Sequence, residues 1–399
     1  MAILYISYDG MLEPLGQSQV LAYQAQLAKD FNLHLLSFEK PQDWAAVESR
    51  IAVARRIAHS GIDWHPRRYH KRLSMLVTAF DILVGVVTGI WLVVHKGVRV
   101  VHARSYVAGL IAIILKKLTG VRFLFDMRGF WADERVDGAL WPRNGILYRV
   151  AKWVERQLLL NADHVVLLTH AAVHEIEKFP YLLGRMPHVT VVPTCTDLTL
   201  FCPKPAVKKE FLLGYVGSVG TWYEFDATVV CFAEMLRLKP KARFLVINRN
   251  DHDYVRERLI AGGVPLSAVE LRAASHSEVP EQMARVLAGV FFYKPSFSRA
   301  ACAPTKLGEF LGCGVPCLGN SGVGDLAEIL EGERVGVVVN DFSSESLSSG
   351  LERLIDLVAE ADIETRCVTA AEKYFSLNEG VDKYRSVYKR LISNSGDNV

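Results

Sequence analysis

The sequence predicts an α/β protein made of two doubly wound parallel sheets. Short apolar runs alternate with helical patterns along the first half, and the same alternation begins again after residues 193–211, which are rich in proline and lysine. Hydrophobic residues make up 50% of the 399 residues and charged residues 22%, which allows two or three cores. Apolar strands that alternate with helices are typical of parallel sheets covered on both faces.

The first half opens on a strand. The run MAILYISYDG has no basic segment and no small-residue cleavage site, so a signal peptide is not expected. The patterns predict helices such as Ser18–Lys29, Val107–Lys117 and Ile146–Leu160 between strands. The predicted strands are Ala2–Tyr8, Asn32–Phe38, Arg99–Ala103, Val121–Asp126, His164–Leu168 and His188–Val192.

The second half repeats this organisation. Its predicted strands are Phe211–Val216, Arg243–Ile247, Ala268–Leu271, Gly289–Phe292, Pro316–Leu318 and Gly336–Val339. We expect a first domain at 1–205, a second at 206–375, and a C-terminal helix at 376–399 that packs back on the first domain. Ligands of open α/β sheets bind beyond the carboxyl ends of the strands, so the strand-to-helix loops are the candidates for function.

One apolar segment, residues 73–94, has the length that a bilayer requires, about 20 residues. Asp81 lies inside it, and a carboxylate in hydrocarbon costs about 3 kcal/mol. A spanning helix would also divide a domain. We therefore expect a buried or surface-docking helix, and the basic stretch at 67–72 suits contact with an anionic membrane surface through residues 67–94.

Composition excludes several function classes. A net charge of +3 is too small to indicate a nucleic acid partner. The seven cysteines are scattered without a CxxC pair, which indicates a reducing, cytoplasmic location and no zinc site. We expect no metal and no other cofactor, because no acidic pair follows a strand; the polar loop NRNDHD at 248–253 leaves that point open.

In each half of the chain, one glycine-rich loop follows the first strand. In the first, Gly10 and Gly16 precede a helix whose free N–H groups suit an anion, or they serve as turn residues only. In the second, Gly214, Gly217 and Gly220 match neither GxGxxG nor a P-loop, so a dinucleotide fingerprint is absent. Such a turn still lets phosphate approach backbone amides.

The stretch APTKLGEFLGCG predicts a helix that begins after Pro304. Lys306 and Glu309 are three residues apart and share a helix face. They form either an exposed salt bridge or a ligand site, in which Lys306 neutralises a diphosphate and Glu309 accepts both hydroxyls of a ribose. We favour the ligand site.

Polar residues also end two strands of the first half. His102 and Arg104 point to the same side by alternation, and Asp126, Arg128 and Glu134 follow the next strand. His102 either binds a donor-sugar hydroxyl or is a core histidine, and Arg104 suits a charged acceptor. We expect Asp126, Arg128 and Glu134 to contact the acceptor or the sugar.

Asp325, in SGVGD, is expected to be a helix N-cap rather than a ligand.

These motifs resemble family 4 glycosyltransferases of the GT-B fold along nearly the whole chain. The likeness rests on YISYDGMLEPLGQSQV, VVHARSYVAGLIA, LFDMRGFWADE, GYVGSVGTWYEFD, APTKLGEFLGCGVP and GVGD. It implies two Rossmann-like domains facing a central cleft, a nucleotide-sugar donor, and transfer with retention. It also implies that Glu309 holds the ribose and that the loop at Gly16 closes over the diphosphate or the reacting sugar.

Two positions depart from the family pattern. Ala301 stands where an acid is usual, and Ser218 stands where an arginine is typical. Lys306 therefore becomes the leading candidate for the charge of the leaving group, helped by amides and side chains of the donor loops. The residues expected to act in catalysis are His102, Lys306 and Gly16. Those expected to bind the donor nucleotide are Glu309, Lys306, Ser218, Gly217, Gly220, Thr221 and Thr305.

The favoured function is a hexosyl transfer from a nucleoside diphosphate sugar, with uridine as the commonest family base, to a lipid-linked or membrane-proximal glycan in polysaccharide biosynthesis. Two alternatives remain. A nucleotide-sugar epimerase of the same fold would turn over the donor without an acceptor. A non-catalytic two-domain sugar-binding protein would release no nucleoside diphosphate.

Overall fold

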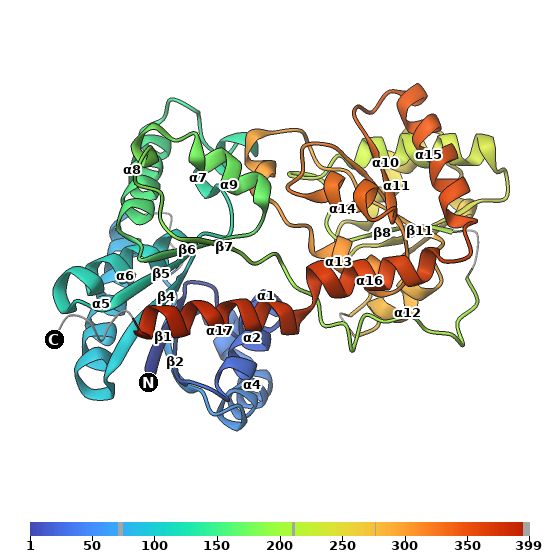
Figure 1. Ribbon diagram of the computed structural model, residues 1–399. Coiled ribbons are helices and arrows are strands. Elements are labelled where there is room, and N and C mark those ends of the chain that lie inside the picture. The colour runs from blue at the N-terminus through green and yellow to red at the C-terminus, as the bar shows by residue number, and fades with distance from the viewer. Residues whose placement is uncertain (71–74, 210–211, 276, 394–399) are drawn as a thin grey trace. The chain divides into compact units, whose positions relative to one another are not determined.

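The computed structural model describes residues 1–70, 75–209, 212–275 and 277–393. The chain forms two units: unit 1 comprises Met1–Val192 with Leu377–Val399, and unit 2 comprises Pro193–Ser376 (Figure 1). The boundary at Val192 precedes the predicted one at 205, because the intervening segment packs in unit 2. The Thr196 N–H donates to the Phe375 carbonyl at 2.8 Å, and Phe201 lies in the core of unit 2.

Unit 1 contains a seven-stranded, parallel sheet in the order β3-β2-β1-β4-β5-β6-β7. The edge strand β3 was not predicted, because its sequence DWHPRR has no apolar run; it is half-buried and contains Pro66, as edge strands tolerate. The strands are β1 (Ala2–Ser7), β2 (Asn32–Glu39), β3 (Asp63–Arg68), β4 (Val98–Arg104), β5 (Arg122–Asp126), β6 (His164–Leu167) and β7 (Val189–Val191).

Helices cover this sheet, and the C-terminal helix α17 (Leu377–Ser393) packs on α2 and β4. The predicted end of that helix, 394–399, lies outside the described residues. The other helical segments of unit 1 are α1 (Pro14–Gly16), the π-helix η1 (Gln17–Leu21), α2 (Ala22–Leu27), α3 (Pro41–Ala45), α4 (Val47–His59), α5 (Met75–Lys96), α6 (Ser105–Thr119), α7 (Trp131–Asp137), α8 (Ile146–Asn161), α9 (His170–Glu177) and η2 (Pro180–Leu182).

The apolar segment forms α5, the described helix that is long and apolar enough to cross a membrane. Its inner face packs on α6, because glycines at 85 and 89 leave room for the side chains of Ile111 and Leu115. Asp81 is buried on this face and accepts hydrogen bonds from Tyr8 Oη at 2.8 Å and from the His70 ring at 2.6 Å. The segment is thus part of unit 1; its predicted start at 73–74 and the basic residues at 71–72 lie outside the described residues.

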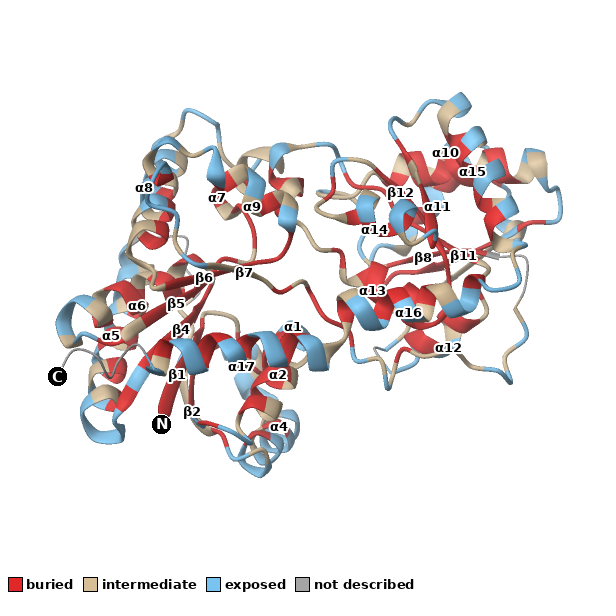
Figure 2. Ribbon diagram, viewed as in Figure 1, coloured by how far each residue is buried: buried red, intermediate tan, exposed pale blue. Residues whose placement is uncertain are grey.

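Unit 2 contains a six-stranded, parallel sheet in the order β10-β9-β8-β11-β12-β13. Figure 2 shows the strands of both sheets largely buried under helices. The predicted first strand of this unit included residue 211, which is outside the described residues. The strands are β8 (Leu212–Val216), β9 (Arg243–Ile247), β10 (Val269–Arg272), β11 (Ala288–Val290), β12 (Cys317–Asn320) and β13 (Gly336–Val339).

The helices of unit 2 connect these strands in βαβ order. They are α10 (Phe225–Leu238), α11 (His252–Ala261), η3 (Leu266–Ala268), α12 (Val279–Ala284), η4 (Phe297–Ala301), α13 (Thr305–Gly312), α14 (Leu326–Gly332), α15 (Ser344–Val358) and α16 (Ile363–Phe375). Asp325 occupies the N-cap position of α14 as predicted, but its side chain makes no capping hydrogen bond.

Each sheet has one topological switch point, where the strand order reverses. In unit 1 it lies between β1 and β4, and in unit 2 between β8 and β11. In open α/β sheets in general, the loops that leave such neighbouring strands diverge to opposite faces, and ligands bind outside the carboxyl ends of these strands. The register in unit 1 pairs Ser7 with Arg104 and Arg104 with Asp126, which brings the predicted polar residues to this point.

Candidate active site

The switch point of unit 2 is built around Lys306. Helix α13 begins at Thr305, as predicted, and places Lys306 in its first turn. The side chain is buried, its Nζ has no hydrogen-bond partner, and it lies 3.8 Å from the ring centre of Tyr223 and 4.6 Å from that of Tyr215. The exposed salt bridge considered for Lys306 and Glu309 is therefore not formed.

Gly217 admits this lysine to the end of β8. Its φ of +124° lies in the region that favours glycine, and a Cβ there would lie 2.9 Å from Lys306 Nζ. The Gly217 N–H donates to the Ile247 carbonyl, and the Gly217 carbonyl accepts from Asn248 Nδ2. The Gly217 N–H is thus used within the sheet rather than offered to a phosphate, and the predicted donor-binding role of Gly217 stays a prediction.

The rest of the β8 loop is a tight turn. Gly220 and Thr221 both have positive φ, +78° and +40°, and the Tyr223 N–H closes the turn on the Gly220 carbonyl. The Ser218 carbonyl accepts a hydrogen bond from Tyr215 Oη at 2.5 Å. The loop therefore holds the two tyrosines that face Lys306, whereas no direct contact with a nucleotide follows from these positions alone.

Burial sets the charge state of the lysine and its neighbour. Burial lowers the pKa of Lys306 to about 7, although the charge of Glu309 opposes the shift. Burial likewise raises the pKa of Glu309 to about 7, opposed by Lys306. A bound anion beside Lys306 would restore its positive charge, which is the electrostatic behaviour expected of a ligand site rather than of a structural ion pair.

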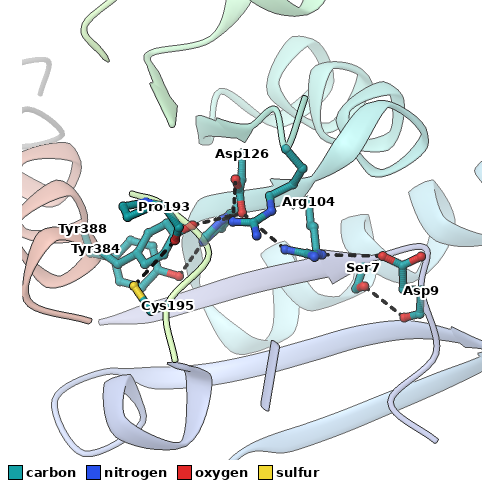
Figure 3. A network of polar contacts seen from close by, with 10 residues as sticks. Ser7, Asp9, Arg104, Asp126, Pro193, Cys195, Tyr384 and Tyr388 are labelled. Carbon is teal, nitrogen blue, oxygen red and sulfur yellow. Dashed lines mark hydrogen bonds and ion pairs between the residues drawn. The ribbon is translucent and has the colours of Figure 1, made fainter. Parts of the chain in front are cut away.

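The switch point of unit 1 is an ion cluster. Arg104 lies between Asp9 and Asp126, with Nε 3.5 Å from the Asp9 carboxylate and one terminal nitrogen 3.9 Å from Asp126 (Figure 3). Arg128 approaches the other Asp126 oxygen at 3.8 Å. Burial raises the pKa of Asp126, but Arg128, His102 and Arg104 outweigh it, so that the pKa lies below its ordinary value.

In this cluster the opposite charges lie close together, but several buried polar atoms have no hydrogen-bond partner. Nε and one terminal nitrogen of Arg104 are buried and have no hydrogen-bond partner, nor has Oδ1 of Asp126. Arg128 adopts a φ of +56°, which is costly for a non-glycine residue and directs it to the carboxylate. Buried donors without partners suit a polar ligand at this edge.

His102 is a core residue. It is fully buried; its Nδ1 lies 2.7 Å from Tyr388 Oη, and its ring packs 4.4 Å from that of Tyr5. Tyr384 covers the same region and donates to Asp126 at 3.0 Å. The alternative of a core histidine fits these contacts, because α17 covers the ring, and the predicted contact of His102 with a sugar stays a prediction.

Gly16 is a packing residue rather than part of an open loop. The helix starts at Pro14, earlier than the predicted Ser18, because proline is favoured at the first helical position. Gly16 has helical φ of −60°, and a Cβ there would lie 2.1 Å from the Gly10 carbonyl oxygen. The expected catalytic role of Gly16 in closing over the donor is thus not supported by its buried helical position.

Glu39, which sequence reasoning missed, holds this loop. Its carboxylate accepts the N–H groups of Met11 at 2.9 Å and Leu12 at 3.2 Å, so these amides are not open to an anion. Glu39 stands at the end of an apolar strand, and an acid in that position is the sequence feature that could have identified it.

Next to Glu39, a cavity of about 460 Å³ is lined by Glu39, Pro41, Trp44, Ala45, Pro66, Arg67 and Arg68.

Glu134 lies in the first turn of α7, the helix that begins at Trp131. Its neighbour Asp133 accepts hydrogen bonds from Tyr148 and Lys152. The predicted contact of Glu134 with the acceptor or the sugar stays a prediction.

A metal was not expected. Among the described residues, His34, Asp63 and His65 have ligand atoms close enough to share an ion, but they lie toward the amino ends of β2 and β3, at the edge opposite the switch point. The polar loop at 248–253 is an Asx turn, in which Asn248 Oδ1 accepts the N–H groups of Asn250 and Asp251.

Comparison with known proteins agrees with this architecture. Residues 19–195 match the Glycosyl transferase 4-like domain. The D-inositol 3-phosphate glycosyltransferase of Segniliparus rotundus is 23% identical over 73% of this chain, and the alignment spans 66% of that relative's length.

Solved structures share the fold at low identity. Sucrose-phosphate synthase of Thermosynechococcus elongatus superposes with a TM-score of 0.74 at 13% identity, covering 98% of this chain and 99% of its own. HepE of Anabaena in complex with UDP superposes with a TM-score of 0.69 at 13% identity, covering 98% and 100%. The likeness to these structures shows that the two units are the Rossmann-like domains of the GT-B fold, and the match to the Glycosyl transferase 4-like domain covers a little under half of the chain.

Proposed function

We propose that this protein transfers a sugar from a UDP-sugar to a lipid-linked or membrane-proximal glycan during polysaccharide biosynthesis. The observation that carries the proposal is Lys306, a buried ammonium without a hydrogen bond at the switch point of unit 2, one turn before Glu309. Structural relatives with this fold were solved with UDP and with UDP-glucose. A diphosphate is the ligand that matches an unpaired cation beside a carboxylate suited to ribose hydroxyls.

The chemistry follows from charge. When the bond between the sugar C1 and the phosphate oxygen breaks, its electron pair stays on the diphosphate, and the ammonium of Lys306 stabilises that added charge by a few kcal/mol, about 3. The acceptor oxygen forms the new bond to C1, and its proton passes to the departing phosphate. Glu309 holds the ribose and so orients the leaving group. Retention of the anomeric configuration is part of this proposal, and the product's anomeric NMR signal tests it.

Release of free UDP tests the proposed reaction. The protein is incubated with UDP-hexoses in the presence and absence of membrane lipid extract, and both UDP and the donor epimer are measured. UDP release that depends on lipid extract is the expected result. Donor epimerisation without UDP would support the epimerase alternative, and binding without turnover under every condition would support the sugar-binding alternative.

The acceptor side of the proposal rests on α5. The side chains of Leu76, Phe80, Leu83, Val87, Trp91 and Val94 are exposed at helical spacing on one face of the helix. Two basic residues, His95 and Lys96, stand in the last turn of the same helix, and Arg67 of β3 donates to Thr88 on α5 at 3.1 Å. An apolar face flanked by cations suits the surface of an anionic membrane, and we propose a peripheral, cytoplasmic location.

Vesicle sedimentation tests this surface. Wild-type protein is expected to bind phosphatidylglycerol vesicles more strongly than phosphatidylcholine vesicles. Val87→Glu is expected to lower that binding at least about tenfold, since it places a charge where the exposed apolar face of α5 would contact the lipid. Leu266→Glu, at an exposed leucine of unit 2, is the matched control and should bind as wild type does. Equal binding by both variants would exclude α5 as the docking face.

A further inference from the structure

A second buried cation lies in the segment that leads into α13. Arg299 is in the middle of η4, between β11 and α13, and only 6% of its surface is exposed. Its guanidinium lies 5.3 Å from the ring centre of Trp222. Its side chain donates one hydrogen bond, to Ser298 Oγ at 3.1 Å. Within the described part of the chain, no carboxylate lies at ion-pair distance from this arginine.

The backbone fixes where this arginine stands. The Arg299 carbonyl accepts the Gly324 N–H at 2.9 Å, which ties η4 to the loop after β12. The Arg299 N–H donates to the Ser296 carbonyl at 3.1 Å. The guanidinium is therefore held against the β8 loop by contacts from two other loops, and all three loops leave the carboxyl edge of the same sheet.

Arg299 and Lys306 face adjacent aromatic residues of the β8 loop. Arg299 stacks on Trp222, and Lys306 lies against Tyr223. Burial raises the pKa of Tyr223, and the positive charge of Arg299 opposes that shift, so Arg299 acts on the same ring that faces Lys306. The two cations thus share one aromatic wall.

Two buried cations on one aromatic wall, with Glu309 opposing the charge of Lys306 only in part, are unfavourable in the ligand-free protein. A buried charge without a partner costs several kcal/mol in general, and a second like charge nearby adds to that cost. Stacking on tryptophan and tyrosine recovers part of it, about 1–2 kcal/mol for each pair. The positive charge that remains would be neutralised by a ligand that brings at least two negative charges.

We propose that Arg299 is the second cation of the diphosphate site and binds the β-phosphate together with Lys306. This inference rests on the proposed function and specifies its site. Ser218, in the β8 loop, has no charge to offer, so both cations come from the segment between β11 and the first turn of α13. An arginine suits this role because its planar fork donates two parallel hydrogen bonds to a phosphate, which a lysine cannot do.

During transfer, Arg299 stabilises the same charge as Lys306. The bond between the sugar C1 and the β-phosphate oxygen breaks, and the electron pair remains on that oxygen. The acceptor oxygen bonds to C1, and its proton goes to the phosphate, so Arg299 gains and loses no proton. Its hydrogen bonds to the phosphate shorten as the charge develops, and this lowers the barrier.

Calorimetry with UDP and UMP tests the assignment, because UMP lacks the β-phosphate. Arg299→Gln is expected to weaken UDP binding about 10- to 100-fold and UMP binding by less than about threefold, so the preference for UDP over UMP collapses. Arg299→Lys keeps the charge and is expected to recover part of that preference. Arg256→Gln removes an exposed arginine of α11 that pairs with Asp253, and it should behave as wild type.

The UDP-to-UMP preference is compared within each protein sample, so partial misfolding of a variant does not mimic the effect. An unchanged preference in Arg299→Gln would overturn the assignment, whether or not overall affinity falls. Melting temperature supplies a second readout: removal of an uncompensated charge should leave the ligand-free protein at least as stable as wild type, and a marked loss of stability would indicate a structural arginine instead. If wild type binds neither nucleotide, the proposed function itself fails.

Discussion

The two switch points are built on the same topology but differ in how they balance charge. In unit 2, Lys306 has no hydrogen bond and Arg299 has no carboxylate among the described residues. In unit 1, Arg104 and Arg128 face the buried carboxylate of Asp126. The switch point of unit 2 therefore leaves positive charge for a ligand to neutralise. At the switch point of unit 1 the protein's own carboxylates neutralise the arginines, and mainly unused hydrogen-bonding groups remain.

This difference separates two kinds of recognition. A nucleoside diphosphate brings its own negative charges. A site whose cations have no hydrogen-bonded or ion-paired partner in the ligand-free protein therefore favours this ligand over an uncharged one. A glycan acceptor offers mainly hydroxyl groups, which fixed arginine and aspartate side chains can orient. The same sheet geometry can thus hold a donor or an acceptor, depending on whether its charges are paired within the protein.

The largest expected effect comes from breaking the balanced cluster. Asp126→Asn leaves Arg104 and Arg128 without their buried carboxylate, and we expect the free energy of unfolding to fall by about 3 kcal/mol or more. Asp9→Asn removes the half-exposed acid on the other side of Arg104 and should cost less than about 1 kcal/mol. Urea denaturation measures both. Equal losses in the two variants would show that the buried cluster is not the stabilising one.

The unbalanced site should respond in the opposite way. Lys306→Met removes an amine that folding buries without a hydrogen-bond partner, so the ligand-free protein should melt at a higher temperature than wild type. The same variant should lose about 2–5 kcal/mol of UDP binding, because the diphosphate loses its cation. Thermal shift with and without UDP measures both. A variant that melts lower than wild type and still binds UDP would contradict the comparison.

Glu309→Ala is expected to have a smaller effect on the same site. It removes a charged acceptor of the ribose hydroxyls and should weaken UDP binding by roughly 1.5–3 kcal/mol while the fold is retained. Calorimetry with UDP measures the change, and Glu328→Ala, on the neighbouring helix α14, is the control. Unchanged affinity in a folded Glu309→Ala protein would show that the ribose lies elsewhere.

The smallest expected effect is a pH dependence. The pKa of Lys306 is lowered by burial to about 7, so the free protein loses this charge as the pH rises above 7, and UDP binding must then take up a proton. Affinity for UDP should therefore fall above pH 7, by at most about tenfold per pH unit. Calorimetry at pH 7, 8 and 9 measures it. The slope should disappear in Lys306→Met, and a slope that persists there belongs to another group.

Much of the fold was accessible from the sequence because continuous apolar runs bury parallel strands in any context. The strands β4, β5, β6 and β9 lie within two residues of their predicted bounds for this reason. The edge strand β3 was missed, since DWHPRR is half-exposed and is held by its pairing with β2. The start of α13 was predicted from Pro304 and Thr305, because helix entry is a local property of the chain.

The candidate site was accessible only in part. Spacing placed Lys306 and Glu309 on one helix face, but the aromatic wall beside Lys306 depends on Tyr215 and Tyr223, which lie far earlier in the chain. His102 and Gly16 were assigned to catalysis, yet α17 buries the histidine and the Gly10 carbonyl packs against the glycine. Arg299 gave no sequence signal, because an arginine in a polar loop is ordinarily solvated.

By itself, the sequence determined where strands and helices form, since apolar periodicity and proline or glycine positions act over a few residues. Only the tertiary structure decided which charges are paired. Burial and the distance to an opposite charge set the energy of an ionised group, and both depend on segments that meet only after folding. For that reason, only the tertiary structure showed that Asp126 lies beside two arginines and that the Lys306 Nζ has no hydrogen-bond partner.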